Sequence, residues 1–440
     1  MQQPIPRRDR GGSALAAPEL DLDAACEYIR RHAKPVADWR VGIEYEILGF
    51  EQSTLARIHR DRVQALLRMF VTLGGAPTLE DLNIIAVRMP FGDITLEPGG
   101  QIEFSGHAER TLSDNASALQ RFLTELHACA QELGIFFVGM GFDPVRSAAD
   151  QSWVLKQRYA IMRPYLGQRG QHAWDMMTRT AAMQTSIDYA DEEDLGRKYV
   201  LGNRLGPIVA AMFANSPFVD GAATGLKSVR YAVWLDTDAD RTGPGPGTLE
   251  EPFDLRRSVA AMLDVPVFFI ERDGELLDYA GLRLTDIPGS NADDFPTLLS
   301  MIFTEARIRD YIELRSADGG TPEMAIALAA FWKGLTYDAE TLGQALWLAP
   351  HLDRAGYRAL QMAVARDALD ARSEGVNVLA LAKELVTLAR TGLAKLAPDE
   401  VSYLDVLAQQ VIVDEVSPAD IKLSDGAASL HRALRTSTVA

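Results

Sequence analysis

The chain carries near its start an acidic, strand-like stretch, Val41-Gly42-Ile43-Glu44-Tyr45-Glu46-Ile47-Leu48-Gly49-Phe50. Side chains alternate between the two faces of a β-strand, so Glu44 and Glu46 project together on one side. The apolar residues between and beside them project on the other side: Ile43, Tyr45 and Ile47. Two neighbouring carboxylates repel each other unless a positive charge lies between them. Alone, the pair is typical of a solvated strand edge, but later stretches repeat the same one-sided design.

The composition indicates a globular protein with an acidic balance. Of the 440 residues, 47% are apolar and 24% are charged, and the formal net charge is −17. This length favours two or three structural units. The negative charge argues against non-specific nucleic-acid binding, which requires basic patches. We therefore expect small-molecule partners and no nucleic-acid partner.

Cysteine and histidine usage limits the kinds of metal site. The two cysteines, Cys26 and Cys129, form no CxxC motif, and the seven histidines form no HExxH or HxxxH pair. Neither a zinc site nor a disulfide framework is therefore indicated. A metal site in this chain would be built of oxygen ligands, which suits Mg²⁺.

The sequence predicts four consecutive parts. Residues 1–18 are rich in Arg, Gly and Pro and lack an apolar core, so we expect a disordered lead-in and no secretory signal. We expect a catalytic sheet-and-helix domain over residues 19–321, a helical region packed on it over 322–425, and a loose tail over 426–440. No long uncharged apolar stretch predicts a membrane span. A cytoplasmic monomer or homodimer is the expectation.

Four later stretches repeat the alternation of the acidic strand. Each places polar or charged residues on one face and apolar residues on the other. They are residues 101–106 with Gln101 and Glu103, 183–189 with Gln184, 228–236 with Arg230 and Trp234, and 311–315 with Glu313 and Arg315. Glu97 lies just before the first of them, at a Pro-Gly-Gly turn. A helix-covered antiparallel sheet shows this pattern when its open face is a binding site.

Residues 151–182 are basic and aromatic in an otherwise acidic chain. The cluster has two interpretations, a site for phosphates or a carboxylate and a surface counter-charge for surrounding acids. Composition favours neither of them. Lys156 and Arg158 are the candidates for contact with a phosphate-bearing ligand.

The polar faces together predict a type of chemistry. They carry five glutamates, namely Glu44, Glu46, Glu97, Glu103 and Glu313. Carboxylates around one cavity repel strongly unless they hold divalent cations, and Mg²⁺ leaves coordination positions open for phosphate oxygens. Arginines on the same surface would neutralise a transferring phosphoryl group or bind a substrate carboxylate. We expect an ATP-dependent reaction on an acidic substrate; the alternative is a sandwich of ordinary amphipathic strands.

Seven motifs in this order resemble a known family. They are Gly-Ile-Glu-Tyr-Glu-x-x-Gly-Phe (42–50), Leu-Glu-Pro-Gly-Gly-Gln-Ile-Glu-Phe-Ser-Gly (96–106), Gly-x-Gly-Phe-x-Pro (139–144), Arg-Tyr-x-Ile-Met-Arg-x-Tyr (158–165), Met-Met-x-Arg-Thr (176–180), Phe-Ala-Asn-Ser-Pro-Phe (213–218) and Glu-Leu-Arg-Ser-Ala-Asp-Gly-Gly (313–320). Over about residues 20 to 420 the chain resembles the plant and proteobacterial type of glutamate–cysteine ligase.

The resemblance implies an α+β fold. Its glutamine-synthetase-like antiparallel sheet would have a polar, concave active-site face, helices behind it and a C-terminal helical layer. The resemblance also implies that L-glutamate, L-cysteine and ATP give γ-glutamylcysteine, the first step of glutathione synthesis. In that reaction the glutamate side-chain carboxylate attacks the γ-phosphate of ATP. The amine of cysteine then takes the resulting acyl phosphate.

The resemblance further implies residue roles. The metal positions are Glu44, Glu46, Glu97, Glu103 and Glu313. Catalytic roles fall to Arg315, Glu44 and Glu103, and ATP contacts to Arg315, Arg158 and Lys156. The substrate pocket matches Arg230, Trp234, Arg163, Thr180, Gln184 and Gln101.

This chain departs from the family pattern at a few positions. Ile47 stands where the plant motif has Lys, Ser186 replaces an asparagine, and Thr180-Ala181-Ala182 replaces Thr-Cys-Thr. The two cysteines do not match the redox disulfide of the plant enzymes, so we expect no such switch. Three hypotheses follow: a glutamate–cysteine ligase, a related ligase that joins glutamate to another amine, and a catalytically silent binding protein.

Overall fold

A nine-stranded antiparallel sheet forms the centre of the molecule in the computed structural model, which describes residues 20–424 and 430–440. The strand order is β14-β15-β7-β1-β5-β4-β3-β2, and β6 pairs with the second half of β1. The strands are β1 (Val41–Glu51), β2 (Ala76–Glu80), β3 (Asn83–Met89), β4 (Gly92–Leu96), β5 (Ile102–Gly106), β6 (Ile135–Val138), β7 (Ala182–Ile187), β14 (Ala306–Ile308) and β15 (Ile312–Asp318).

Alternation along β1 gives the sheet one apolar and one polar face. Ile43, Tyr45 and Ile47 are fully buried, and the Tyr45 hydroxyl donates to Gly320 O at 2.7 Å. Helices pack behind this apolar face and contact its strands, namely α2 (Arg60–Thr72), α3 (Leu112–Leu133) and α11 (Pro322–Thr336). The expected antiparallel sheet backed by helices is thereby confirmed.

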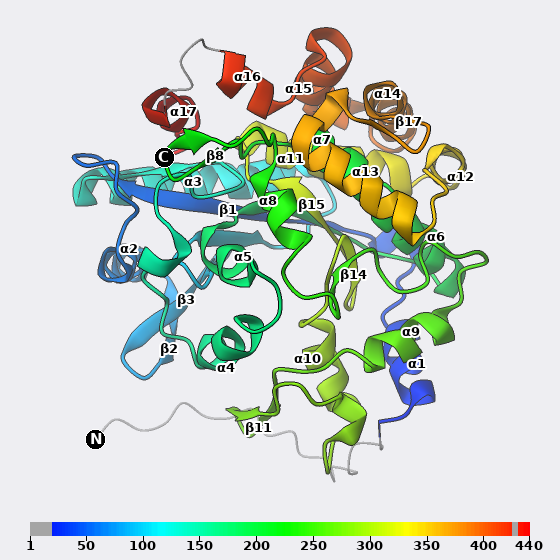
Figure 1. Cartoon of the computed structure of the whole chain (residues 1–440), viewed down its shortest axis with the longest axis horizontal. Helices are drawn as coiled ribbons and strands as arrows, with labels where there is room; N and C mark the ends of the chain where they lie inside the picture. The colour runs from blue at the N-terminus through cyan, green and yellow to red at the C-terminus, as the bar shows by residue number, and fades with distance from the viewer. Residues whose placement is uncertain (1–19, 425–429) are drawn as a thin grey trace.

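Several short helices lie over the polar face or beside the edge of the sheet (Figure 1). They are α1 (Leu22–Arg30), α4 (Gln157–Leu166), α5 (Ala173–Arg179), α8 (Val229–Trp234), α9 (Leu255–Leu263) and α10 (Phe295–Leu299). Helices α6 (Glu192–Arg204) and α7 (Gly206–Met212) instead pack against β15 on its apolar side, where a side chain on Gly202 would meet Leu314 at 2.5 Å. A hairpin of β11 (Phe269–Arg272) and β12 (Glu275–Asp278) lies near α4.

The remaining helices gather along one side of the molecule (Figure 1, yellow to red). They are α12 (Ala339–Leu348), α13 (Arg354–Asp367), α14 (Val378–Leu396), α15 (Asp405–Ala408), α16 (Pro418–Ser424) and α17 (Leu430–Thr436). Helix α11 connects them to the sheet, because it is apolar all round and lies between β7 and α14. Such a helix belongs in a core.

The local signals of the sequence place most element boundaries correctly. Helix α3 begins after Thr111, whose side chain accepts from Asp114 N, and ends at Gly134 with a φ of 64°. Glycine adopts this left-handed conformation without steric cost, so it stops the helix. Two sequence patterns extend beyond the observed elements. The helical pattern of residues 191–213 divides at Leu205, and the apolar, strand-like pattern of residues 135–142 ends as a strand at Val138.

The largest difference concerns residues 228–236, which we expected to form a strand. They form the short helix α8, because the Ser228 side chain caps its first turn by accepting from Tyr231 N. Aromatic and β-branched residues in this stretch favour a strand locally, but a strand propensity is weak against tertiary contacts.

The expected loose tail also differs from the structure. Residues 1–18, the predicted lead-in, lie outside the described residues, as do 425–429. Residues 433–440, by contrast, dock on β6: Phe137 N donates to Ala440 O at 2.7 Å and Gly139 N donates to Ser437 O at 2.9 Å. Leu434 enters a small second core beside Leu48 and Val138.

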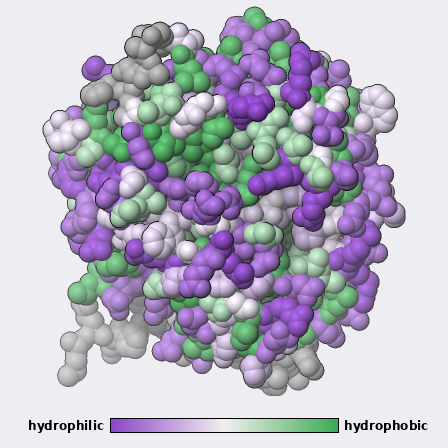
Figure 2. All heavy atoms as spheres, viewed as in Figure 1, coloured by the Kyte–Doolittle hydropathy of each residue, from purple (hydrophilic) through white to green (hydrophobic). Residues whose placement is uncertain are grey.

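The visible surface mixes hydrophilic and hydrophobic residues (Figure 2). None of the described helices combines the length and the apolar character that a membrane crossing requires. Cys26 and Cys129 are both buried and free.

The docked C-terminus generates a stability prediction. Leu434 is 0% exposed, so Leu434→Ala should lower the free energy of unfolding by about 2–5 kcal/mol. Leu82, which is 91% exposed, provides the matched control, and Leu82→Ala should change it by less than about 0.5 kcal/mol. Urea denaturation measures both. Equal effects of the two substitutions would contradict the docking of the tail.

Candidate active site

A cavity of about 310 Å³ lies on the polar face of the sheet. It brings together twelve of the residues singled out from the sequence: Glu44, Glu46, Glu97, Glu103, Lys156, Arg158, Thr180, Gln184, Arg230, Trp234, Glu313 and Arg315. Strands β1, β5, β7 and β15 supply the floor, and α4, α5 and α8 supply the sides. Residues that lie far apart in the sequence therefore meet at one place.

Four glutamates form an acidic wall on the β1 and β5 side. Glu46 lies directly opposite Glu103 in the register of these strands. The Glu46 carboxylate accepts from Ala182 N at 2.8 Å and from the Gln184 amide at 3.0 Å. No arginine or lysine forms a direct ion pair with Glu44, Glu46, Glu97 or Glu103 in the described part of the chain.

Burial and crowding shift the protonation of this wall. Burial, followed by repulsion from Glu313 and Glu103, raises the pKa of Glu44 well above its ordinary range. Burial and the neighbouring carboxylates raise the pKa of Glu46 to about 8. The same causes raise the pKa of Glu97 to about 7. The carboxyl groups of the acidic wall therefore hold protons at a higher pH than ordinary glutamates do. A bound cation could take the place of these protons.

A basic wall stands opposite, on β14 and β15. Arg307 lies directly across from Glu313 in the register and pairs with it at 2.7 Å. Arg315 pairs with the same carboxylate. Burial alone would raise the pKa of Glu313, but the two guanidinium groups outweigh it and lower that pKa to about 2. Glu313 therefore remains ionised and holds both arginines.

Gln184 connects the two walls. Its amide oxygen accepts from Arg315 Nη1 at 2.7 Å, and its amide nitrogen donates to Glu46 at 3.0 Å. A glutamine offers both a donor and an acceptor, which suits a position between a cation and an anion.

Several buried nitrogen atoms on the lining have no hydrogen-bond partner in the described part of the chain. They are Arg158 Nε, Arg230 Nε, Arg307 Nε and Trp234 Nε1. Unsatisfied buried donors are uncommon in folded proteins and call for a specific cause. Their concentration around one cavity indicates a site suited to an anionic ligand.

Two further cations line the cavity at the start of α4, Lys156 as its N-cap residue and Arg158 in its first turn. The Lys156 ammonium donates to Leu96 O at 2.8 Å, and burial lowers its pKa. Arg158 lies 5.9 Å from the ring centre of Tyr159 and forms no ion pair in the described part of the chain. Both side chains therefore remain available to a negatively charged group.

Two residues expected in the pocket lie outside it. Arg163 is exposed and stacks over Trp153 and Trp174, at 4.4 and 5.3 Å from their ring centres. Because α4 turns 100° per residue, Arg158 and Met162 share the cavity face and Arg163 does not.

Gln101 is likewise buried away from the cavity. Its side chain accepts from Gly99 N at 2.9 Å and donates to Thr180 O at 2.8 Å. A side chain on Gly99 would meet Thr178 O at 2.1 Å. Gln101 thus fixes the Pro-Gly-Gly turn against the end of α5. Its side chain does not reach the cavity, so this structure does not place it where it could contact a substrate.

The sequence reasoning missed several lining residues. They include Arg307, Arg309, Tyr159, Met162, Met176 and Met177. Arg307 and Arg309 alternate with Ala306 and Ile308, which is the same signal that identified the other polar faces. The methionines carried no distinguishing signal, because such residues are usual in cores.

Among the described residues, no group of three or more His, Cys, Asp or Glu side chains is arranged to hold a metal ion. Glu313 is occupied by two arginines, and Glu46 is hydrogen-bonded to Ala182 and Gln184. The all-carboxylate chemistry of the acidic wall nevertheless fits a hard divalent cation.

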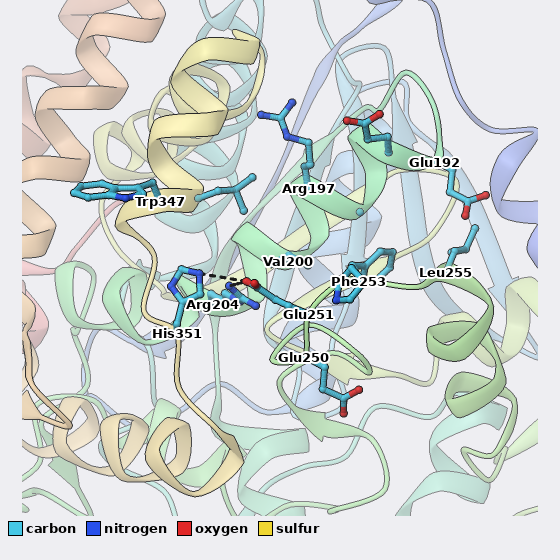
Figure 3. A pocket seen from close by; sticks show the side chains of 14 residues that line it. Glu192, Arg197, Val200, Arg204, Glu250, Glu251, Phe253, Leu255, Trp347 and His351 are labelled. Carbon is cyan, nitrogen blue, oxygen red and sulfur yellow. Dashed lines mark hydrogen bonds and ion pairs between the residues drawn. The ribbon is translucent and has the colours of Figure 1, made fainter.

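A second hollow of about 940 Å³ lies elsewhere, between α6, α9 and α12 (Figure 3). Glu251 there pairs with Arg204 at 2.8 Å and with His351 at 3.2 Å, and Trp347 is exposed at its edge. This hollow is larger but contains none of the residues that the sequence singled out. Since its central charges are already paired, we place the active site in the smaller cavity.

Comparisons with known proteins identify the family of the chain. A family model described as glutamate–cysteine ligase family 2 matches residues 40–432. The chain is 34% identical to glutamate–cysteine ligase A, chloroplastic, of Oryza sativa subsp. indica, over 95% of this chain and 89% of the relative. It is also 34% identical to the chloroplastic glutamate–cysteine ligase of Brassica juncea, over 93% of this chain and 81% of that relative.

A solved structure shares the fold. It is a glutamate–cysteine ligase of Francisella tularensis in complex with AMP, with a TM-score of 0.54 and 13% identity. The alignment covers 91% of this chain and 87% of that one.

The raised carboxyl pKa values generate a pH prediction. The unfolded chain releases protons from Glu46 and Glu97 near the ordinary value of 4.5, whereas the folded protein keeps them to about pH 8 and 7. Without divalent cations, the free energy of unfolding should therefore fall as pH rises from 5 to 8. Each group contributes about 1.4 kcal/mol per pH unit between its two pKa values.

Chemical denaturation at pH 5, 6, 7 and 8 measures this slope. Glu46→Gln should make the slope shallower, because the substituted side chain does not titrate. Exposed Glu193 provides the control, and Glu193→Gln should leave the slope as it is in the wild type. A Glu46→Gln variant with an unchanged slope would contradict the assigned environment of Glu46.

Proposed function

Because the chain belongs to glutamate–cysteine ligase family 2, we propose that it joins the γ-carboxylate of L-glutamate to the amine of L-cysteine with ATP. This is the first step of glutathione synthesis. One observation carries the proposal: an acidic wall and a basic wall face one cavity and are joined through Gln184. The reaction requires both, because it brings a polyphosphate and a carboxylate together.

The proposed reaction has two steps. A carboxylate oxygen of the glutamate side chain attacks the γ-phosphorus of ATP, and ADP leaves. The amine of cysteine then attacks the acyl carbon, loses a proton and expels inorganic phosphate. The substrate carboxylate is itself the nucleophile, so no side chain of the protein has to form a covalent intermediate.

The basic wall is proposed to stabilise the negative charge of the phosphoryl group that is transferred in the first step. Arg315 and Arg307 are held by Glu313, and guanidinium groups stabilise a transferring phosphoryl group. Arg309 lines the same cavity. Lys156 and Arg158 are proposed to contact other phosphates of ATP from α4.

Arg230 and Trp234 are proposed to hold the glutamate substrate. Both line the cavity from α8. A guanidinium group binds a carboxylate in a fixed geometry. Thr180 lies on the neighbouring wall and offers a hydroxyl, although its side chain already donates to Met176 O at 2.6 Å.

Mg²⁺ is proposed to bind at the acidic wall. Glu44, Glu97 and Glu103 are the ligand candidates with the fewest protein partners, and Glu46 stands beside them. A bound Mg²⁺ would neutralise phosphate charge. Glu313 is committed to two arginines in the ligand-free arrangement, so its assignment as a ligand stays a prediction.

A second candidate differs only in the acceptor amine. Ala182 lines the cavity at a position where the family pattern has Thr, so the wall is smaller and less polar there. This observation favours a related ligase that accepts a different amine. The two candidates share the phosphoryl chemistry.

A phosphate-release assay separates the candidates. With Mg²⁺, ATP and L-glutamate, we expect phosphate release to depend on L-cysteine and to be much weaker with other amines at equal concentration. A different amine that gives the highest rate would establish the second candidate. No release with any amine would identify a silent binding protein on the same fold.

The acidic wall is tested by Glu44→Gln. The substitution keeps the shape of the side chain but removes a charge, so kcat should fall by about 100-fold or more. The Mg²⁺ concentration needed for half-maximal rate should rise. Glu51, at the far end of the same strand, pairs with Arg62, and Glu51→Gln is the control with near-normal activity. A fully active Glu44→Gln enzyme would refute the metal assignment.

A further inference from the structure

The helix α8 has only six residues, yet it carries both Arg230 and Trp234 to the cavity. Such a short helix has few internal hydrogen bonds, so they alone do not stabilise it or fix its orientation. Contacts with its neighbours must therefore fix the orientation of these side chains. Most of these contacts come from residues that do not line the main cavity, and the backbone of Arg315 is the exception.

Asp318, the last residue of β15, lies beneath the start of α8 and is fully buried. One carboxylate oxygen accepts from Asn215 N at 2.8 Å and from the Ser216 hydroxyl at 2.6 Å. The other accepts from the Ser228 hydroxyl at 2.9 Å. A side chain on Gly141 would meet this carboxylate at 2.5 Å or less, so the pocket around it has no spare room.

The two serines connect Asp318 to the first turn of α8. The Ser216 hydroxyl accepts from Arg230 N at 3.1 Å, and the Ser228 hydroxyl accepts from Tyr231 N at 3.0 Å. Since each hydroxyl oxygen accepts from a backbone N–H, its own hydrogen is directed to Asp318. The carboxylate is thus linked through two hydroxyls to two consecutive amides of the helix.

Asp318 also faces the guanidinium group of Arg230. Arg230 Nη1 lies 3.8 Å from a carboxylate oxygen. The same guanidinium donates to Arg315 O at 2.9 Å and to Ser316 O at 3.3 Å. Both the backbone and the side chain of Arg230 are therefore tied to the end of β15.

We propose that Asp318 is a positioning residue that fixes α8 through Ser216 and Ser228 and thereby directs Arg230 toward the carboxylate of the acidic substrate. The inference rests on the proposed function, in which Arg230 binds L-glutamate. Asp318 does not touch the substrate. It acts through a helix that is too short to orient itself.

A second buried carboxylate supports the other side of α8. Glu305 accepts from the Tyr231 hydroxyl at 2.7 Å, from Gln361 at 2.8 Å and from the Ser316 hydroxyl at 2.6 Å. Tyr231 follows Arg230 in the helix. The arginine is therefore flanked by two anchored neighbours, Ser228 and Tyr231, which limits rotation of α8 about its axis.

Single serine variants test the proposal. Ser216→Ala and Ser228→Ala each remove one link and should weaken L-glutamate binding to the full-length protein by about three- to tenfold, measured by calorimetry. Binding of ATP should change less than twofold. Ser258 is a fully buried serine on α9 whose hydroxyl donates to Pro246 O, and Ser258→Ala should leave both affinities unchanged.

A double-substitution cycle tests the route of the effect. Asp318→Asn should weaken glutamate binding more than either serine variant. If Asp318 acts through Arg230, its substitution should have little further effect in an Arg230→Lys background. Steady-state kinetics should show the same split, with a higher KM for glutamate and a nearly constant KM for ATP.

The outcomes separate this inference from the proposed function. Wild-type protein that does not bind L-glutamate would overturn the proposed function, and the inference with it. If the wild type binds it and both serine variants bind it equally well, the inference alone is wrong. Equal losses of glutamate and ATP affinity in the variants would also overturn it, because they would indicate a general structural role.

Discussion

The ion pairs of Glu313 hold the polar face of the sheet together. This buried carboxylate binds Arg307 and Arg315, Arg315 donates to Gln184, and Gln184 donates to Glu46. These ion pairs and hydrogen bonds form one continuous row of linked side chains from the basic wall to the acidic wall. Removing one member of a buried ion pair leaves a charge without compensation and costs about 3–5 kcal/mol. The arrangement of the cavity therefore depends on this carboxylate before any ligand binds.

The register of the sheet makes this row possible. Its members come from β14, β15, β7 and β1, which are neighbours in the strand order. Arg307 faces Glu313, Glu313 faces Ser186, and Gln184 faces Glu44 across their strand pairs. A slip of one residue in any pair would turn a whole strand over and send its polar side chains into the apolar core. The apolar face that packs on α11 thereby also protects the register of the site.

The sequence predicted the polar faces well, because alternation is a local property of each strand. It could not predict which elements surround them. Residues 228–236 form a helix where a strand was expected, yet Arg230 and Trp234 still point to the cavity. Their spacing of four explains this, because it places two residues on one face of a strand and also on one face of a helix. Arg163 lies five residues after Arg158, and the helical turn of α4 carries it away from the cavity.

The five glutamates share one alternation in the sequence but fall into two groups in the structure. Glu313 is neutralised within the protein, because the pairing of β14 with β15 sets Arg307 opposite it. Among the described residues, no arginine pairs with Glu44, Glu46 or Glu97, and their pKa values are raised. Raised pKa values lower the stability of the ligand-free protein above about pH 5. The cation that we propose for the acidic wall would offset this cost when bound. The two groups of glutamates differ only in which residues the neighbouring strands place beside them. A single sequence does not show which strands pair, so it could not distinguish the two groups.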